Sequence, residues 1–260
     1  MKEDLVVVLG IMLPWIGTIL GAAMALFLKR SLNPRVNKTL SGFAAGVMIA
    51  ASVWSLLLPA LEMAEEAGVV PSIPAVTGFL VGALFLLLLD ILIRWITRHS
   101  SNPDGTTSQS KRNMVMLAVT LHNLPEGMAV GVTLAGLIRG DAVTTAAAMS
   151  LVIGISVQNF PEGAIISMPL AAAGKGKGRA FMMGVLSGIV EPIGALVTLV
   201  LTWLIAPALP YILAFAAGAM IYVVAEELIP QAQAGPHSYM GTIGVTLGFA
   251  AMMLLDTLLG

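Results

Sequence analysis

The chain contains no cysteine and few charged residues. Its 260 residues include three His, and only 10% are Asp, Glu, Lys or Arg, against about a quarter in a typical soluble domain. The absence of cysteine excludes disulfides and thiolate metal sites. The formal net charge of −1, with no long basic or acidic tail, gives no indication of nucleic-acid binding. With 58% hydrophobic residues, the composition predicts a protein that crosses the lipid bilayer several times.

Long apolar runs predict an all-α membrane protein that forms a single domain over 1–260. A membrane span needs about 20 apolar residues. The segment at 97–113 is polar, and its Ser, Gly and Thr content predicts a flexible loop. The N-terminus lacks a small-residue cleavage site, so we interpret it as the flank of the first span and not as a removed signal peptide. Eight spans are expected, at 5–28, 39–62, 73–96, 114–137, 144–171, 180–206, 209–229 and 240–259.

The basic residues fall on one side of these expected spans. Four lie within 29–38, four within 94–112 and three within 175–179, which places 11 of the 13 Lys and Arg on the same side. Because positive charge accumulates in cytoplasmic loops, this side is expected to face the cytoplasm. The segment 97–113 is then a cytoplasmic loop, and both termini are extracytoplasmic.

Two short motifs occur twice. "FAAGVMI" at 43–49 returns as "FAAGAMI" at 215–221, and "HNLPEG" at 122–127 returns as "QNFPEG" at 158–163. An odd number of spans separates the copies of each motif, so the copies cross the membrane in opposite directions. Inverted repeats are typical of secondary transporters, which bind their substrate near the membrane midplane where the repeats meet. Recurrence of small-residue packing motifs by chance is the alternative, and it suits the first pair better than the second.

The "N-x-P-E-G" motif places polar side chains on one face of each helix. Residues three and four apart share a helix face, so each Glu lies beside two neutral donors of nitrogen or oxygen. Pro125 and Pro161 each leave a backbone carbonyl without its amide partner and open space beside these side chains. The residues brought together in this way are His122, Asn123 and Glu126 in the first copy and Gln158, Asn159 and Glu162 in the second.

A third acidic residue, Glu191, lies in the sixth expected span and is also followed by a proline. Buried carboxylates are costly unless a partner compensates them, and no Lys or Arg is expected at this depth. A divalent cation would satisfy the charge and the lone pairs together. Carboxylate, imidazole and amide oxygen suit Zn²⁺, Fe²⁺ or Mn²⁺. The sequence therefore predicts an intramembrane metal site with candidate ligands His122, Asn123, Glu126, Gln158, Asn159, Glu162 and Glu191, and Met48 as a weak thioether candidate.

These candidates also have simpler interpretations. An intramembrane His often makes packing hydrogen bonds, and an intramembrane Glu can be protonated or carry protons. The Asn and Gln side chains could hold the ligands in place without touching the ion. Met48 could equally be a packing residue. Asp90, Glu226 and Glu227, at the inner ends of the third and seventh spans, could hold an ion on its way out or could pair with Arg94.

The motifs "HNLPEG" and "QNFPEG", with "EP" in the sixth span and "AEEL" in the seventh, resemble the ZIP (Zrt-, Irt-like protein) family, closest to its prokaryotic-type GufA-like branch. The resemblance covers essentially the whole chain. It implies uptake of zinc, often with Fe²⁺, Mn²⁺ or Cd²⁺, into the cytoplasm across a prokaryotic plasma (inner) membrane, by a protein that has no prosthetic group and is not an enzyme. It also implies a 3+2+3 inverted-repeat bundle in which one helix group slides against the other. Small-residue faces on many spans would permit a homodimer.

The family resemblance also implies two adjacent metal sites. The first would use His122, Glu126, Gln158 and Glu162, with Met48 nearby. The second would use Asn123, Asn159 and Glu191, bridged to the first by Glu126 and Glu162. Family members often carry Asp where this chain has Asn159, so this chain has one negative charge fewer at the second site.

Two other functions compete with transport when the residues alone are considered. A membrane-embedded metal-dependent hydrolase could use His and Glu on one helix face to activate water. The sequence lacks H-E-x-x-H, however, and inverted repeats have no evident purpose in an enzyme. A proton or ion channel could use the same acids, and saturable, slow flux would argue against it.

Overall fold

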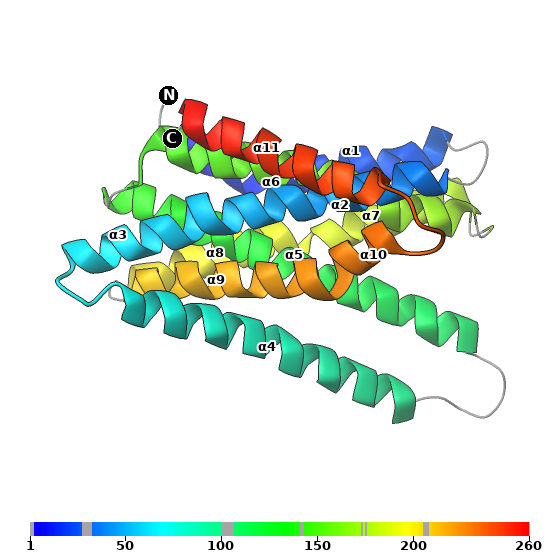
Figure 1. Ribbon diagram of the computed structural model, residues 1–260, viewed down its shortest axis with the longest axis horizontal. Coiled ribbons are helices and arrows are strands. Elements are labelled where there is room, and N and C mark those ends of the chain that lie inside the picture. The colour runs from blue at the N-terminus through cyan, green and yellow to red at the C-terminus, as the bar shows by residue number, and fades with distance from the viewer. Residues whose placement is uncertain are drawn as a thin grey trace.

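The computed structural model describes residues 3–27, 33–99, 107–140, 143–172, 174, 176–204 and 208–259. All regular elements in these ranges are helices, as predicted (Figure 1). They are α1 (Glu3–Phe27), α2 (Pro34–Ala51), the π-helical η1 (Ser52–Leu57), α3 (Leu58–Glu66), α4 (Ser72–His99), α5 (Thr107–Arg139), α6 (Thr145–Ala172), α7 (Lys177–Gly188), α8 (Val190–Leu204), α9 (Leu209–Val223), the π-helical η3 (Val224–Leu228), α10 (Ile229–Gln233) and α11 (Met240–Leu259).

Seven stretches of the described residues are long and apolar enough to cross a membrane. They correspond to all the expected spans except the fourth, which falls on the long helix α5. The helices extend further than the apolar runs, because α4 continues to His99 and α5 already begins at Thr107. Parts of the segment predicted as the loop 97–113 are therefore helical. The seven stretches are Asp4–Phe27, Pro34–Glu66, Ser72–Leu92, Thr145–Met168, Lys177–Thr202, Leu209–Gln233 and Met240–Leu258.

The long helices run roughly along one common direction. The turn at 67–71, between α3 and α4, lies at the left end of the bundle in Figure 1, where α11 also ends. The segment 234–239, between α10 and α11, lies at the right end. Helix α4 lies at the edge of the bundle and packs along α9.

Glycines bring particular pairs of helices into backbone contact. A Cβ atom added at Gly21 of α1 would lie 1.9 Å from the carbonyl oxygen of Phe160 in α6, and one added at Gly127 of α5 would lie 2.3 Å from that of Glu191 in α8. Because no side chain fits at these distances, the two backbones touch directly. The pairs α1–α6 and α5–α8 are thus held by close backbone packing, as is common in membrane bundles.

Two further pairs are packed in the same way. A Cβ added at Gly46 of α2 would lie 2.1 Å from the carbonyl oxygen of Val245 in α11, and one added at Gly82 of α4 would lie 2.0 Å from that of Phe215 in α9. We call α1 with α5–α8 the first helix group, and α2–α4 with α9–α11, including η1 and η3, the second helix group.

The boundary between the two groups is packed differently. Among the described glycines, none whose added Cβ would meet a backbone carbonyl within 3.0 Å faces the other group. Gly154 of α6 does face α11, but there its neighbour is the flexible side chain of Met252, whose sulfur lies 2.1 Å from an added Cβ. Each backbone contact at a described glycine thus joins two helices of the same group, and at Gly154 a side chain lies between the groups.

The repeated "FAAG" motif is followed in both copies by a π-helical segment. Each segment begins nine residues after the Phe of the motif, at Ser52 after Phe43 and at Val224 after Phe215. Isolated π-helical turns inside α-helices are rare and occur most often near functional sites. The motif thus recurs in local structure as well as in sequence.

The sixth expected span is divided into two helices. Helix α7 ends at Gly188 and α8 begins at Val190. Pro192 explains the division, because it has no amide hydrogen to bond to the carbonyl of Gly188, four residues earlier. The break places Glu191 in the first turn of α8.

Candidate metal centre

Five of the predicted ligands lie buried where α5, α6 and α8 meet. The hydrogen bonds between their side chains join the two copies of the polar motif to each other and to α8. The chain keeps these groups close because the glycines of the pair α5–α8 allow backbone contact at Glu191 itself. The five residues, each at most 1% exposed, are Asn123, Glu126, Gln158, Asn159 and Glu191.

The carboxylate of Glu191 accepts three hydrogen bonds. Its Oε1 accepts from the hydroxyl of Thr18, at 2.9 Å, and from the amide Nδ2 of Asn123, at 3.1 Å. Its Oε2 accepts from the amide Nδ2 of Asn159, at 2.7 Å. Because α1, α5 and α6 supply one donor each, this carboxylate links α8 to three other helices of the chain.

The amide of Gln158 joins the two copies of the polar motif. Its Nε2 donates to Oε1 of Glu126 and to Oδ1 of Asn159, the latter at 2.6 Å. Asn159 also donates to the carbonyl of Pro14 in α1, at 3.3 Å. The amide of Asn159 is therefore engaged through both its nitrogen and its oxygen.

Three oxygens of this cluster have no hydrogen-bond donor within the described part of the chain. They are Oδ1 of Asn123, Oε2 of Glu126 and Oε1 of Gln158, and all three are buried. A buried acceptor without a donor costs about 1–3 kcal/mol. All three oxygens, one of them on a carboxylate, are acceptors of the kind that bind cations.

The other predicted ligands are placed less completely. The side chain of His122 lies outside the described residues, although its backbone is part of α5. Glu162 is partly exposed on α6, and Met48 is buried in the main hydrophobic core. Among the described side chains, no group of three or more His, Asp or Glu is spaced to hold a metal ion.

Sequence analysis did not identify Thr18 or Ser187 as part of this cluster. Thr18 donates to Glu191, and the carbonyl of Ser187 accepts from Asn123 at 3.2 Å. A further repeat was available as a signal: "TILGA" at 18–22 has the same T/E-x-x-G-A spacing as "EPIGA" at 191–195. Thr18 thus occupies in α1 the position that Glu191 occupies in α8.

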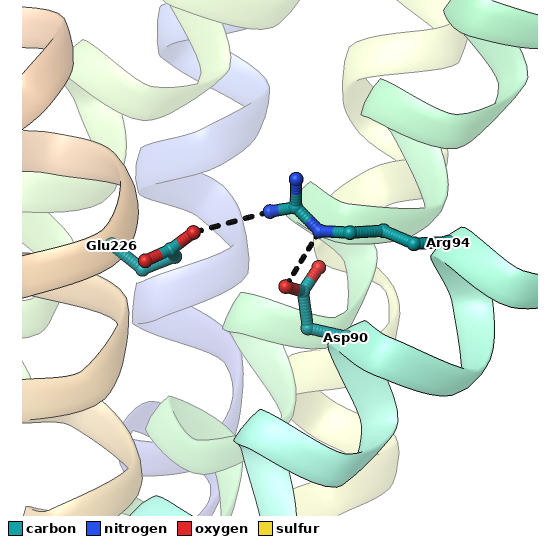
Figure 2. Close-up of polar contacts among 3 residues, drawn as sticks. All are labelled: Asp90, Arg94 and Glu226. Carbon is teal, nitrogen blue, oxygen red and sulfur yellow. Dashed lines mark hydrogen bonds and ion pairs between the residues drawn. The ribbon is translucent and has the colours of Figure 1, made fainter.

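The acidic residues at the ends of the third and seventh spans lie apart from this cluster along the chain. Figure 2 shows Arg94 between Asp90 and Glu226. Its Nε lies 2.7 Å from Oδ2 of Asp90, and its Nη2 lies 3.2 Å from Oε1 of Glu226. Pairing with Arg94, one of the two interpretations of these acids, is therefore observed for Asp90 and Glu226. Glu227 is partly buried next to Glu226.

A second hydrogen-bonded carboxylate crosses the boundary between the helix groups. Asp256 of α11 accepts from the hydroxyl of Ser55 in η1, at 3.1 Å, and from that of Ser150 in α6, at 2.8 Å. Ser55 and Asp256 belong to the second helix group and Ser150 to the first. The bond from Ser150 thus links the two groups directly.

Residues 98–256 match the family described as ZIP zinc transporter. This chain belongs to the ZIP family. It is 36% identical to the zinc transporter ZIP11 of Xenopus tropicalis, over 97% of this chain and 96% of that protein. It is 40% identical to the zinc transporter ZIPB of Bordetella bronchiseptica, over 97% and 81%, and 34% identical to the zinc transporter GufA of Myxococcus xanthus, over 80% and 81%.

The family confirms the resemblance that the doubled motif indicated. A ZIP protein is an integral membrane transporter of divalent metal ions and not an enzyme, so the alternative of a membrane-embedded hydrolase is wrong. Its relatives include animal as well as bacterial proteins.

Proposed function

We propose that this ZIP protein carries zinc into the cytoplasm and binds the ion midway through the membrane between α5 and α6. The observation that carries the proposal is the set of three buried oxygens without donors, on Asn123, Glu126 and Gln158. A desolvated cation would supply the missing partner of all three. The names of the relatives, all zinc transporters, favour zinc as the ion.

The donors would divide the work of binding. Glu126 and Glu162 would supply negative charge, the oxygen of Gln158 a neutral contact, and the imidazole of His122 a directional nitrogen ligand. Met48 would be at most an accessory thioether ligand. Without thiolates the site would bind moderately tightly, as release requires, and Fe²⁺, Mn²⁺ and Cd²⁺ could also use it.

The two helix groups would move against each other to expose the site alternately to the two sides. Support for this elevator-like step comes from the glycines, because backbone contacts lie within each group and a flexible Met252 side chain lies at the boundary. Helix pairs held by backbone packing would move as units, whereas side chains between the groups could repack.

An inverted 3+2+3 repeat would give the bundle its symmetry. The repeat would relate α1 to α7–α8, α2 to α9, α4 to α11 and α5 to α6. Under this relation the packed pair α1–α6 corresponds to α5–α8, and the packed pair α2–α11 corresponds to α4–α9. All four pairs are in close contact. The π-helical segments that follow both "FAAG" motifs support the same relation.

The orientation follows from the basic residues, 11 of 13 of which lie on one side. That side would be the cytoplasm, with both termini outside, in the plasma (inner) membrane of a prokaryote. Asp90, Glu226 and Glu227 would then lie towards the cytoplasmic side and could receive the ion after it leaves the centre, in competition with Arg94.

Uptake of radioactive Zn²⁺ into proteoliposomes tests the proposal. The native chain is compared with Glu126→Gln, which removes the charge of the central carboxylate, and with Glu65→Gln, the same change at an exposed residue. We expect saturable uptake by the native chain and by Glu65→Gln, and loss of most uptake in Glu126→Gln with unchanged folding. Normal uptake by a folded Glu126→Gln variant would refute the site. Fast uptake that does not saturate would favour a channel.

A further inference from the structure

We infer that the centre holds one divalent cation at a time, because Thr18, Asn123 and Asn159 occupy the carboxylate of Glu191 in place of a second ion. The inference rests on the proposed function and concerns the number of ions that the same centre accepts. It assigns Glu191 to positioning the surrounding helices, and it assigns metal binding to the side of the cluster that carries Glu126.

The lone pairs of Glu191 are the first argument. A carboxylate offers about four lone-pair directions, and three of them accept hydrogen bonds from Thr18, Asn123 and Asn159. One direction remains, on Oε2, so a cation could bind Glu191 only through that lone pair, and a cation held by both oxygens would have to displace a donor. Glu126 is different, because only its Oε1 has a donor and its Oε2 has none within the described part of the chain.

The amide of Asn159 is the second argument. Its NH₂ group donates to Oε2 of Glu191 and to the carbonyl of Pro14, so Asn159 presents hydrogen atoms and no acceptor to Glu191. Its oxygen already accepts from Gln158. An ionised aspartate at this position would present acceptors alone, so two carboxylates would face each other and a cation between them would relieve their repulsion.

The counterpart of Glu191 in the repeat is the third argument. Thr18 and Glu191 open the related sequences at 18–22 and 191–195, and their side chains bond to each other at 2.9 Å. One of the two related positions carries a carboxylate and the other a hydroxyl, so the hydroxyl of Thr18 can donate a hydrogen bond to the carboxylate of Glu191. Gly188 leaves the room for this contact, since an added Cβ would lie 2.8 Å from Thr18 and 2.9 Å from Oε1 of Glu191.

Metal stoichiometry of the purified full-length chain in detergent tests the inference. After equilibrium dialysis against a low concentration of Zn²⁺, bound zinc per chain is measured by mass spectrometry of the metal. The comparison uses the native chain, Asn159→Asp, and the double variant Asn159→Asp/Glu191→Gln. The double variant exchanges the amide and the carboxylate, so it keeps the native number of carboxylates and a donor–acceptor pair. Asn33→Asp adds the same charge at an exposed residue and serves as the control.

We expect one zinc per chain for the native protein, for the double variant and for the control, and two for Asn159→Asp. Because two unpaired carboxylates would destabilise it, Asn159→Asp should also unfold at a lower temperature than the native chain without zinc, and zinc should raise its unfolding temperature more. This second measurement keeps the test decisive if the variant is unstable without metal.

Two results would overturn the inference while leaving the proposed function intact. One is a native chain that binds two zinc ions. The other is Asn159→Asp that still binds one ion and gains no additional stabilisation from zinc. Zinc binding that survives in Glu126→Gln would instead contradict the proposed function.

Discussion

Two glycine substitutions with equal initial overlaps are predicted to have unequal effects. A Cβ added at Gly46 would lie 2.1 Å from the carbonyl oxygen of Val245, and a Cβ added at Gly154 would lie 2.1 Å from the sulfur of Met252. The first overlap is with a helix backbone of the same group. The second is with a flexible side chain at the boundary between the groups. The substitutions Gly46→Ala and Gly154→Ala therefore separate the nature of the neighbour from the size of the clash.

The magnitudes follow from what each neighbour can do. In Gly46→Ala, α2 and α11 must separate by roughly 1 Å, and such overpacking destabilises by about 1–3 kcal/mol. In Gly154→Ala, Met252 can rotate about three side-chain bonds, and replacing Gly by Ala inside a helix contributes up to about 1 kcal/mol. The free energy of unfolding should thus fall for Gly46→Ala and change by less than about 1 kcal/mol for Gly154→Ala.

Thermal unfolding of the detergent-solubilised variants, followed by tryptophan fluorescence, measures the difference. For a chain of this size, each kcal/mol shifts the unfolding temperature by roughly 2–4 °C. Gly46→Ala should therefore unfold several degrees below Gly154→Ala. Equal unfolding temperatures would show that the backbone contact does not hold α2 against α11, and the argument from glycine packing to rigid helix pairs would fail.

Two further substitutions test contacts outside the centre. Ser150→Ala removes a hydrogen bond to Asp256 that the proposed sliding of the groups would have to break. At about 1 kcal/mol, its loss should speed the proposed zinc uptake about fivefold. Ser156→Ala, whose hydroxyl bonds to its own helix, should leave uptake unchanged. Equal rates for the two variants in proteoliposomes would contradict this role. Arg94→Met should lower the free energy of unfolding by less than about 1 kcal/mol, because the Arg94 side chain is 49% exposed and that of Glu226 is 48% exposed. A clearly larger loss in a denaturant titration would show that the ion pairs hold α4 in place.

The centre was largely predictable because its residues are spaced along helices. The i, i+3 spacing in the first copy of the motif placed Asn123 beside Glu126, and the i, i+4 and i, i+3 spacings in the second copy placed Gln158 and Asn159 beside Glu162. The proline after Glu191 marked the third element. The structure brings together the five candidate ligands Asn123, Glu126, Gln158, Asn159 and Glu191, whereas Thr18 and Ser187, which are also buried there, were not named from the sequence.

Contacts between helices distant in the chain were not predictable in the same way. Thr18 is one hydroxyl in a long apolar helix, and its role appears only when α1 is compared with α8. Asp256 accepts from Ser55 and Ser150, which lie 201 and 106 residues away, so no local pattern marks the group. The glycines predicted close packing but did not identify which helix each one would meet.

The pairing of helices also sets the order in which the protein can be completed as it is made. Helix α2 is synthesised early, yet Gly46 meets its backbone partner, Val245, only in α11, the last helix. Helix α1 likewise waits for α6. For much of translation, the small-residue face of α2 must remain in lipid or against temporary neighbours. Assembly therefore cannot follow synthesis helix by helix, and a chain that stops before α11 leaves the surface of its second helix without the backbone it was shaped to meet.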